Sequence, residues 1–162
     1  MAVVTPKQFH AKFSNGICGM FNWQRFLADK WPVEIVSLTD RQAFANLRLS
    51  WFLSPDSVFV AFDEPRATPV RLDDVQNWYP FLPREQRNRI EQMKREYLEG
   101  SRKLEFEFPS YAIPTNEHLV LDANHRLSAL ALSGASFLLH MFVVKGPLDP
   151  DALADLRHFC LK

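Results

Sequence analysis

The chain has 162 residues, of which 47% are hydrophobic, and its 19 lysine and arginine residues balance 19 aspartate and glutamate residues. This length and apolar content are typical of one folded domain and exclude a disordered chain, and zero net charge excludes an overall field that would draw the protein onto a polyanion. The longest apolar runs fall short of the roughly 20 residues that span a bilayer, and the only cysteines are Cys18 and Cys160. We therefore expect no membrane insertion, a reduced cysteine pair and a cytoplasmic location.

Alternating elements are expected in the first half of the chain. Apolar residues at helical spacing over residues 9–31 predict two short helices around a turn near Asn15 and Gly16. Thr39 or Asp40 is placed to cap a helix over 41–47. Short strands are expected before and after that helix, at residues 33–36, 58–62 and 70–72. A proline-rich connection over 77–83 disfavours both helix and sheet.

The strongest helical pattern covers residues 84–99 and stops at Gly100. Its apolar side carries Ile90, Met93, Tyr97 and Leu98. Opposite charges spaced i,i+4 predict a solvent-facing surface with many salt bridges: Glu85–Arg89, Arg87–Glu91, Glu91–Arg95 and Arg95–Glu99. The alternative is that basic side chains in and after this helix follow a DNA backbone: Arg84, Arg87, Arg89, Lys94, Arg95, Arg102 and Lys103.

The second half of the chain has a more regular pattern. Apolar and charged residues alternate over 104–108, which predicts a half-buried strand, and a turn over 114–117 leads into a second strand over 118–121. A short helix should then end at Gly134, before an interior strand over 137–144. A final helix is expected over 148–161, with Asp149 as its N-cap and three apolar residues that dock it: Leu153, Leu156 and Phe159. The tryptophans are interpreted as core residues rather than base-stacking ones: Trp23, Trp31, Trp51 and Trp78.

The most informative segment is the turn after the strand over 118–121. There the chain runs directly into a short polar stretch and a helix: Asp122, Ala123, Asn124, His125 and Arg126. Unpaired backbone N–H groups and the positive end of the macrodipole attract anions to a helix N-terminus, and an imidazole and a guanidinium beside them form a compact phosphate site. In the alternative interpretation, Asp122 or Asn124 merely caps the helix while His125 and Arg126 are solvated.

The sequence Leu-Asp-Ala-Asn-His-Arg at 121–126, between a strand–turn–strand unit and a short helix, resembles the motif of the ParB/sulfiredoxin-like superfamily. The resemblance covers about residues 70–144, leaving 1–69 without a recognised counterpart. It implies one α+β domain over 1–162 with a small mixed β-sheet flanked by helices. Branches of the superfamily include partition proteins, nucleases, sulfiredoxin, a free-serine kinase and plasmid fertility-inhibition proteins of the Osa type. The sulfiredoxin branch has a cysteine where this chain has Asn124, which disfavours that branch.

The resemblance also implies roles for the residues of this turn. ATP or another nucleotide would be held by Ala123, Asn124, His125, Arg126 and Leu127, and the catalytic residues would be Asp122, His125 and Arg126. Ala123 stands where the family usually has glycine, and its Cβ costs about 1 kcal/mol if the backbone takes a positive φ. Glu105 and Glu107 share one strand face and are candidates, with Asp122, to ligate Mg²⁺. The alternative for these glutamates is an ordinary exposed polar face.

The function that these expectations favour is hydrolysis of phosphate bonds, as an ATPase with or without Mg²⁺-dependent nuclease activity. In that mechanism the helix amides and Arg126 stabilise charge on the phosphoryl oxygens, and His125 donates a hydrogen bond or a proton. One alternative is a non-catalytic module that binds DNA or a conjugation or partition protein. Another is phosphotransfer from ATP to a small hydroxyl substrate.

Overall fold

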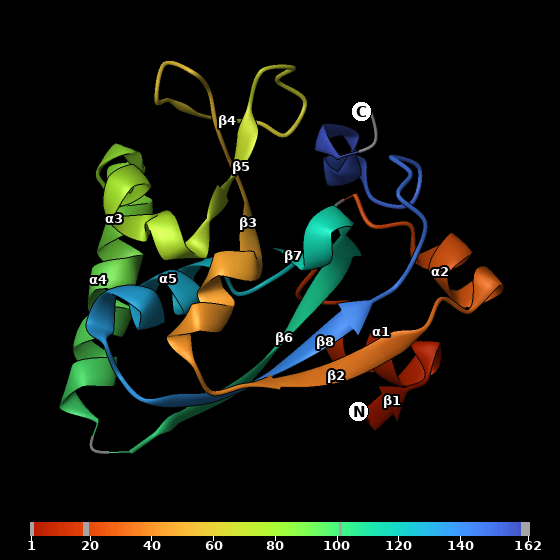
Figure 1. Ribbon diagram of the computed structural model, residues 1–162, viewed down its shortest axis with the longest axis horizontal. Coiled ribbons are helices and arrows are strands. Elements are labelled where there is room, and N and C mark those ends of the chain that lie inside the picture. Colours follow the sequence, from red (N-terminus) through yellow and green to blue (C-terminus); the bar gives the residue numbers. More distant parts are fainter. Residues whose placement is uncertain (1, 18–19, 101, 160–162) are drawn as a thin grey trace.

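The computed structural model describes residues 2–17, 20–100 and 102–159, which form an α+β fold around one mixed sheet (Figure 1). The described residues give an eight-stranded sheet in the order β1-β2-β8-β6-β7-β3-β4, with β5 also paired to β3. The strands are β1 (Ala2–Val4), β2 (Val33–Leu38), β3 (Leu47–Leu53), β4 (Phe59–Val60), β5 (Thr68–Arg71), β6 (Leu104–Ile113), β7 (Glu117–Val120) and β8 (Phe137–Val144). The expected α+β class and mixed sheet are confirmed.

Two strand pairs in this sheet are parallel. β6 runs parallel to β8, and β3 runs parallel to β7 with Leu49 opposite Val120. The other neighbours are antiparallel, including β2 and β8, which join Val33 to Val144. Because β2 and β3 come from the first 69 residues, that part of the chain belongs to the same sheet as the segment that carries the motif.

The helices lie on both sides of the sheet. In Figure 1, α3 (Val75–Trp78), α4 (Arg84–Glu99) and α5 (Asn124–Ser133) gather on one side, and α1 (Pro6–Phe13) and α2 (Trp23–Asp29) lie on the other. Short 3₁₀ helices complete the chain: η1 (Arg41–Asn46), η2 (Leu72–Asp74), η3 (Tyr79–Phe81), η4 (Pro114–Asn116) and η5 (Ala154–His158). Among the described residues, no helix has the length and apolar character needed to cross a membrane.

Hydrophobic side chains form two cores, and β8 contributes to both because successive side chains on a strand point to opposite faces. Leu139, Met141 and Val143 join the core beside α4 and α5. Phe142 and Val144 join the core beside α1 and α2. This alternation explains why an almost continuous apolar run, the expected interior strand, is buried on both faces.

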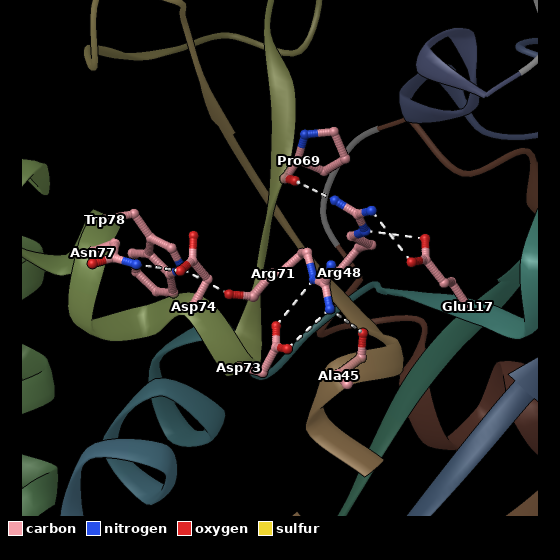
Figure 2. A network of polar contacts seen from close by, with 9 residues as sticks. All are labelled: Ala45, Arg48, Pro69, Arg71, Asp73, Asp74, Asn77, Trp78 and Glu117. Atoms are coloured by element: carbon pink, nitrogen blue, oxygen red, sulfur yellow. Dashed lines mark hydrogen bonds and ion pairs between the residues drawn. The ribbon is translucent and has the colours of Figure 1, made fainter. Parts of the chain in front are cut away.

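A polar network ties β3 to its neighbours (Figure 2). The Arg48 guanidinium on β3 donates to both carboxylate oxygens of Glu117 on β7, at 3.1 and 3.2 Å, and to the Pro69 carbonyl on β5. Arg71 donates to the Asp73 carboxylate and the Ala45 carbonyl, while the Trp78 indole donates to the Arg71 carbonyl. These bonds link β3 to β5 and β7, and the Arg48–Glu117 pair lies at the start of β7, opposite the end that leads into the predicted site.

Several predicted elements are confirmed. The helices α1 and α2 lie on either side of the expected turn, and α4 covers the expected 84–99 and ends at Gly100. The helix α5 ends at Gly134, whose φ of 71° is the left-handed conformation that stops a helix. β2 and β8 also lie where the apolar patterns placed them.

Other predictions are wrong. The sequence analysis did not identify β3, and the expected strand over 58–62 is reduced to the half-buried pair Phe59–Val60. The segment 77–83 was expected to be neither helix nor strand, but it contains the end of α3 and the 3₁₀ helix η3. The helix predicted over 41–47 is a 3₁₀ helix that ends at Asn46. The last helix is replaced, in the described residues, by turns and η5, because Leu153 is extended and forms a β-bridge with Phe21. Cys18 and Cys160 lie outside the described residues.

The salt bridges expected along α4 do not form. In the part of the chain that the structure describes, the ion pairs within 4.0 Å lie elsewhere, and none joins two residues of α4. An exposed pair gains little over two hydrated charges, so its side chains stay apart. Leu98 is 59% exposed and does not share the buried side of Ile90.

Candidate functional site

The predicted turn lies where β7 ends beside its parallel neighbour β3. β7 finishes at Val120, and β3 continues past that point through Ser50 and Trp51, because Leu49 is the residue opposite Val120. The chain then turns at 121–123 and enters α5. Sites outside the carboxyl ends of parallel strands are where open α/β sheets commonly bind ligands.

Ala123 is the N-cap of α5 and has a left-handed backbone, with φ 101° and ψ 20°. It is 5% exposed, and its N–H is bound at 2.8 Å by the Asp122 side chain. Asp122 therefore binds the residue before the helix, and no side chain caps α5. A positive φ favours glycine, so the Cβ of alanine costs about 1 kcal/mol at this position.

The first amides of α5 are free of protein acceptors. The N–H of Leu127 binds the Ala123 carbonyl at 2.9 Å, so the preceding N–H groups of Asn124, His125 and Arg126 have no partner one turn earlier. Within the described residues no other protein group accepts from them. Leu127 itself is fully buried in the core and its N–H is used, as is that of Ala123. The N–H groups of Ala123 and Leu127 are thus both used within the protein, and the expected part of these two residues in nucleotide binding stays a prediction.

Asn124 is fixed by two hydroxyl groups. Its Nδ2 donates to Ser50 Oγ on β3 at 3.1 Å, and its carbonyl accepts from Ser128 Oγ at 2.7 Å. The first contact ties the start of α5 to the middle of β3. It also holds the Asn124 side chain away from the capping role that the alternative interpretation assigned to it.

His125 is held between α4 and β3. Its Nε2 contacts Gln86 Oε1, and its ring meets the Trp51 ring edge to face at 5.0 Å. Burial, and then the nearby Arg89 charge, lower the pKa of His125, and Asp122 opposes them. The lowered pKa favours the neutral imidazole at pH 7. Because the Gln86 amide oxygen that faces Nε2 can only accept, we assign the proton to Nε2 and the lone pair to Nδ1.

Arg126 is the third residue of α5 and carries a positive charge. Its guanidinium lies 4.9 Å from the centre of the Phe106 ring, a cation–π distance. Among the described residues no carboxylate lies within ion-pair distance of Arg126. The first turn of α5 therefore combines unsatisfied donors with a positive charge that has no counter-ion among the described residues.

The three carboxylates predicted to hold Mg²⁺ are engaged separately. Glu105 binds the His140 imidazole at 3.1 Å, and Glu107 forms an ion pair with Lys12. Asp122 packs against Gly16, where an added Cβ would lie 2.5 Å from Asp122 Oδ2. In the described ranges no group of three histidine, cysteine, aspartate or glutamate residues could hold a metal ion. These residues do not fit a protein-held Mg²⁺, and we derive no catalytic step through one.

A cavity of about 290 Å³ adjoins the turn and was not found by sequence reasoning. It is lined by Ser50, Trp51, Phe52, Phe59, Val60, Ala61, Phe62, Leu82, Pro83, Gln86 and Asp155. Three of these residues, Ser50, Trp51 and Gln86, are the ones that contact Asn124 and His125. The cavity and the turn are thus parts of one site, separated by a single layer of side chains.

Asp155 is the charged residue of this cavity wall. Burial raises the pKa of its carboxyl group to about 6, although the nearby His158 lowers it. In the described part of the chain no hydrogen-bond donor or ion-pair partner contacts the Asp155 carboxylate. The sequence held one weak signal for this residue, a single acid within the apolar stretch Ala-Leu-Ala-Asp-Leu at 152–156.

Comparisons with models of known protein families, with curated proteins and with solved structures found no match to this chain. The resemblance to the ParB/sulfiredoxin-like superfamily therefore stays a prediction from the sequence motif and the order of elements around it.

Proposed function

We propose that this protein binds the phosphate groups of ATP or another nucleotide at residues 122–126 and hydrolyses the terminal phosphate bond. The observation that carries the proposal is the combination, at one turn, of free amides at the start of α5 with an Arg126 cation that no described carboxylate neutralises. Phosphate oxygens satisfy both groups, since a helix N-terminus and a guanidinium each favour negative charge.

The chemistry follows from the protonation of His125. Its lowered pKa and its Nε2 contact with Gln86 leave Nδ1 as a proton acceptor. In the proposed step a water oxygen bonds to the terminal phosphorus, the bond from phosphorus to the bridging oxygen breaks, and the water proton moves to Nδ1. The α5 amides and Arg126 stabilise the charge that develops on the phosphoryl oxygens. His125 thus acts as a base, in place of the donor role expected from the sequence.

The test is phosphate release from nucleoside triphosphates, with and without Mg²⁺, by the purified protein. Arg126→Ala and the triple substitution of Asn124, His125 and Arg126 by alanine should each lower binding and release at least about 100-fold, as loss of a transition-state donor does. Arg66→Ala, at an exposed arginine before β5, is the matched control and should retain full activity. Undiminished release by the triple variant would overturn the assignment.

A second candidate function is a DNA- or partner-binding module. It is supported by the α4 arginines, which in the described residues form no ion pair within the helix. Replacing Arg84, Arg89 and Arg95 together should then weaken DNA binding and flatten its dependence on salt, while Arg126→Ala should leave both unchanged. DNA binding that is unchanged by the three α4 substitutions would exclude this surface as the DNA-binding site.

A further inference from the structure

We propose that the cavity beside the turn binds the base of the nucleotide and selects guanine through the Asp155 carboxylate. This inference rests on the proposed function, because it places the base next to the phosphate-binding turn.

The walls of the cavity suit a flat aromatic ring. Four of the lining residues are aromatic, namely Trp51, Phe52, Phe59 and Phe62. Aromatic side chains stack on any of the nucleobases, because every base has a flat π-face. The volume of about 290 Å³ lies just below the roughly 300 to 1,000 Å³ typical of pockets for drug-sized ligands. One ring system therefore matches the space better than a whole nucleotide, whose phosphates would lie outside it.

The position of the cavity agrees with a ligand that extends to the turn. Ser50 and Gln86 line the cavity and also bind Asn124 and His125. A base among the aromatic residues would thus be one side-chain layer from the free amides of α5. A sugar can span that layer and deliver the phosphates to Arg126.

Asp155 supplies the selectivity. Within the described residues it is the charged group of the cavity wall, and neither a donor nor a cation contacts it. A carboxylate accepts hydrogen bonds through two adjacent oxygens and donates none. The guanine ring N–H and its neighbouring amino group present two donors side by side, whereas adenine and cytosine present one donor beside one acceptor. Guanine therefore satisfies both oxygens of a half-buried carboxylate that otherwise lacks partners.

Calorimetric titration can test the base and phosphate portions separately. Guanosine, adenosine and cytidine probe the cavity without phosphate, and pyrophosphate probes the turn without a base. We expect guanosine to bind about 10-fold or more tightly than adenosine and cytidine, the discrimination typical of a paired hydrogen-bond contact. Asp155→Asn should abolish that preference and leave pyrophosphate binding unchanged. Asp151→Asn, an exposed acid just before the same segment, is the matched control and should retain the preference.

The outcomes separate the two proposals. Equal binding of the three nucleosides, or a guanosine preference that survives Asp155→Asn in a folded variant, would overturn the base site. Pyrophosphate binding without nucleoside binding would also overturn it while upholding the phosphate site. A guanosine preference that depends on Asp155, without pyrophosphate binding, would uphold the cavity assignment and overturn the proposed function.

Discussion

Asp155→Asn should make the protein more stable at neutral pH. The carboxyl group is half-buried in an aromatic-lined cavity, and its pKa rises from the ordinary 3.8 to about 6. The folded state therefore holds this proton more tightly than the unfolded state, so stability decreases as the pH rises from about 4 to 6 and stays lower above that window. At about 1.36 kcal/mol per pH unit, the rise costs up to about 3 kcal/mol at pH 7. Asparagine has a similar shape without the charge and should recover most of this free energy.

Urea unfolding at pH 7.5 and pH 4.0 measures the effect. The gain in unfolding free energy of Asp155→Asn over the native chain should be largest at pH 7.5 and nearly vanish at pH 4.0, where the native carboxyl group is protonated in the folded state. Asp151→Asn, at an exposed position, should show no such dependence. An Asp155→Asn variant that is less stable at pH 7.5, or that has the same pH profile as the native protein, would refute the reasoning.

Three further substitutions test the site and its support by thermal or urea unfolding. Ala123→Gly should change the free energy of unfolding by less than about 0.5 kcal/mol, because relief of the strain at φ 101° offsets the added entropy of the unfolded chain. As a control, Ala129→Gly inside α5 should cost at least about 1 kcal/mol. Equal losses in the two variants would contradict the strain at Ala123. Arg48→Met should destabilise the folded protein by about 1 to 3 kcal/mol, because it leaves the largely buried Glu117 carboxylate without its partner. Adding Glu117→Gln to this variant should recover part of that loss. Purely additive losses would show that the two side chains are not coupled. Gly134→Ala should lower the free energy of unfolding by about 1 kcal/mol through its φ of 71° alone, since an added Cβ meets nothing within 4 Å. An unchanged unfolding midpoint would argue against that backbone strain.

Periodic patterns predicted the parts of the fold that depend on local sequence. The helix α4 has a long apolar stripe and a terminal glycine, and β8 is apolar enough to be buried on both faces. β3 was missed although Leu47, Leu49, Trp51 and Leu53 alternate with other residues, because the strand directly follows a segment that favours helix and Phe52 blurs the alternation. The final helix was wrong because a tertiary contact, the bridge between Leu153 and Phe21, outweighs a good local helix start.

In the candidate site too, residues placed by local sequence could be predicted, and those placed by tertiary contacts could not. Asn124, His125 and Arg126 lie at a helix N-terminus as predicted, because a strand, a polar turn and a helix are consecutive in the chain. Asp155 could not be predicted, since its cavity joins segments that are distant in sequence, around residues 50, 60, 85 and 155. The carboxylates at 105 and 107 share a strand, but their partners come from other elements, which no pattern within that strand reveals.

The order of strands has a consequence for how this chain folds during synthesis. β2 pairs with β1 on one side and with β8 on the other, and β8 ends at Val144. The inner edge of β2 therefore stays without its native neighbour until residues 137–144 have been synthesised and have left the ribosome. Such distant pairing slows folding and exposes an open strand edge in the meantime. Glu34 lies on β2 and forms an ion pair with Lys145 in the folded protein. Until that pair forms, its charge disfavours association of the open β2 edge with other chains.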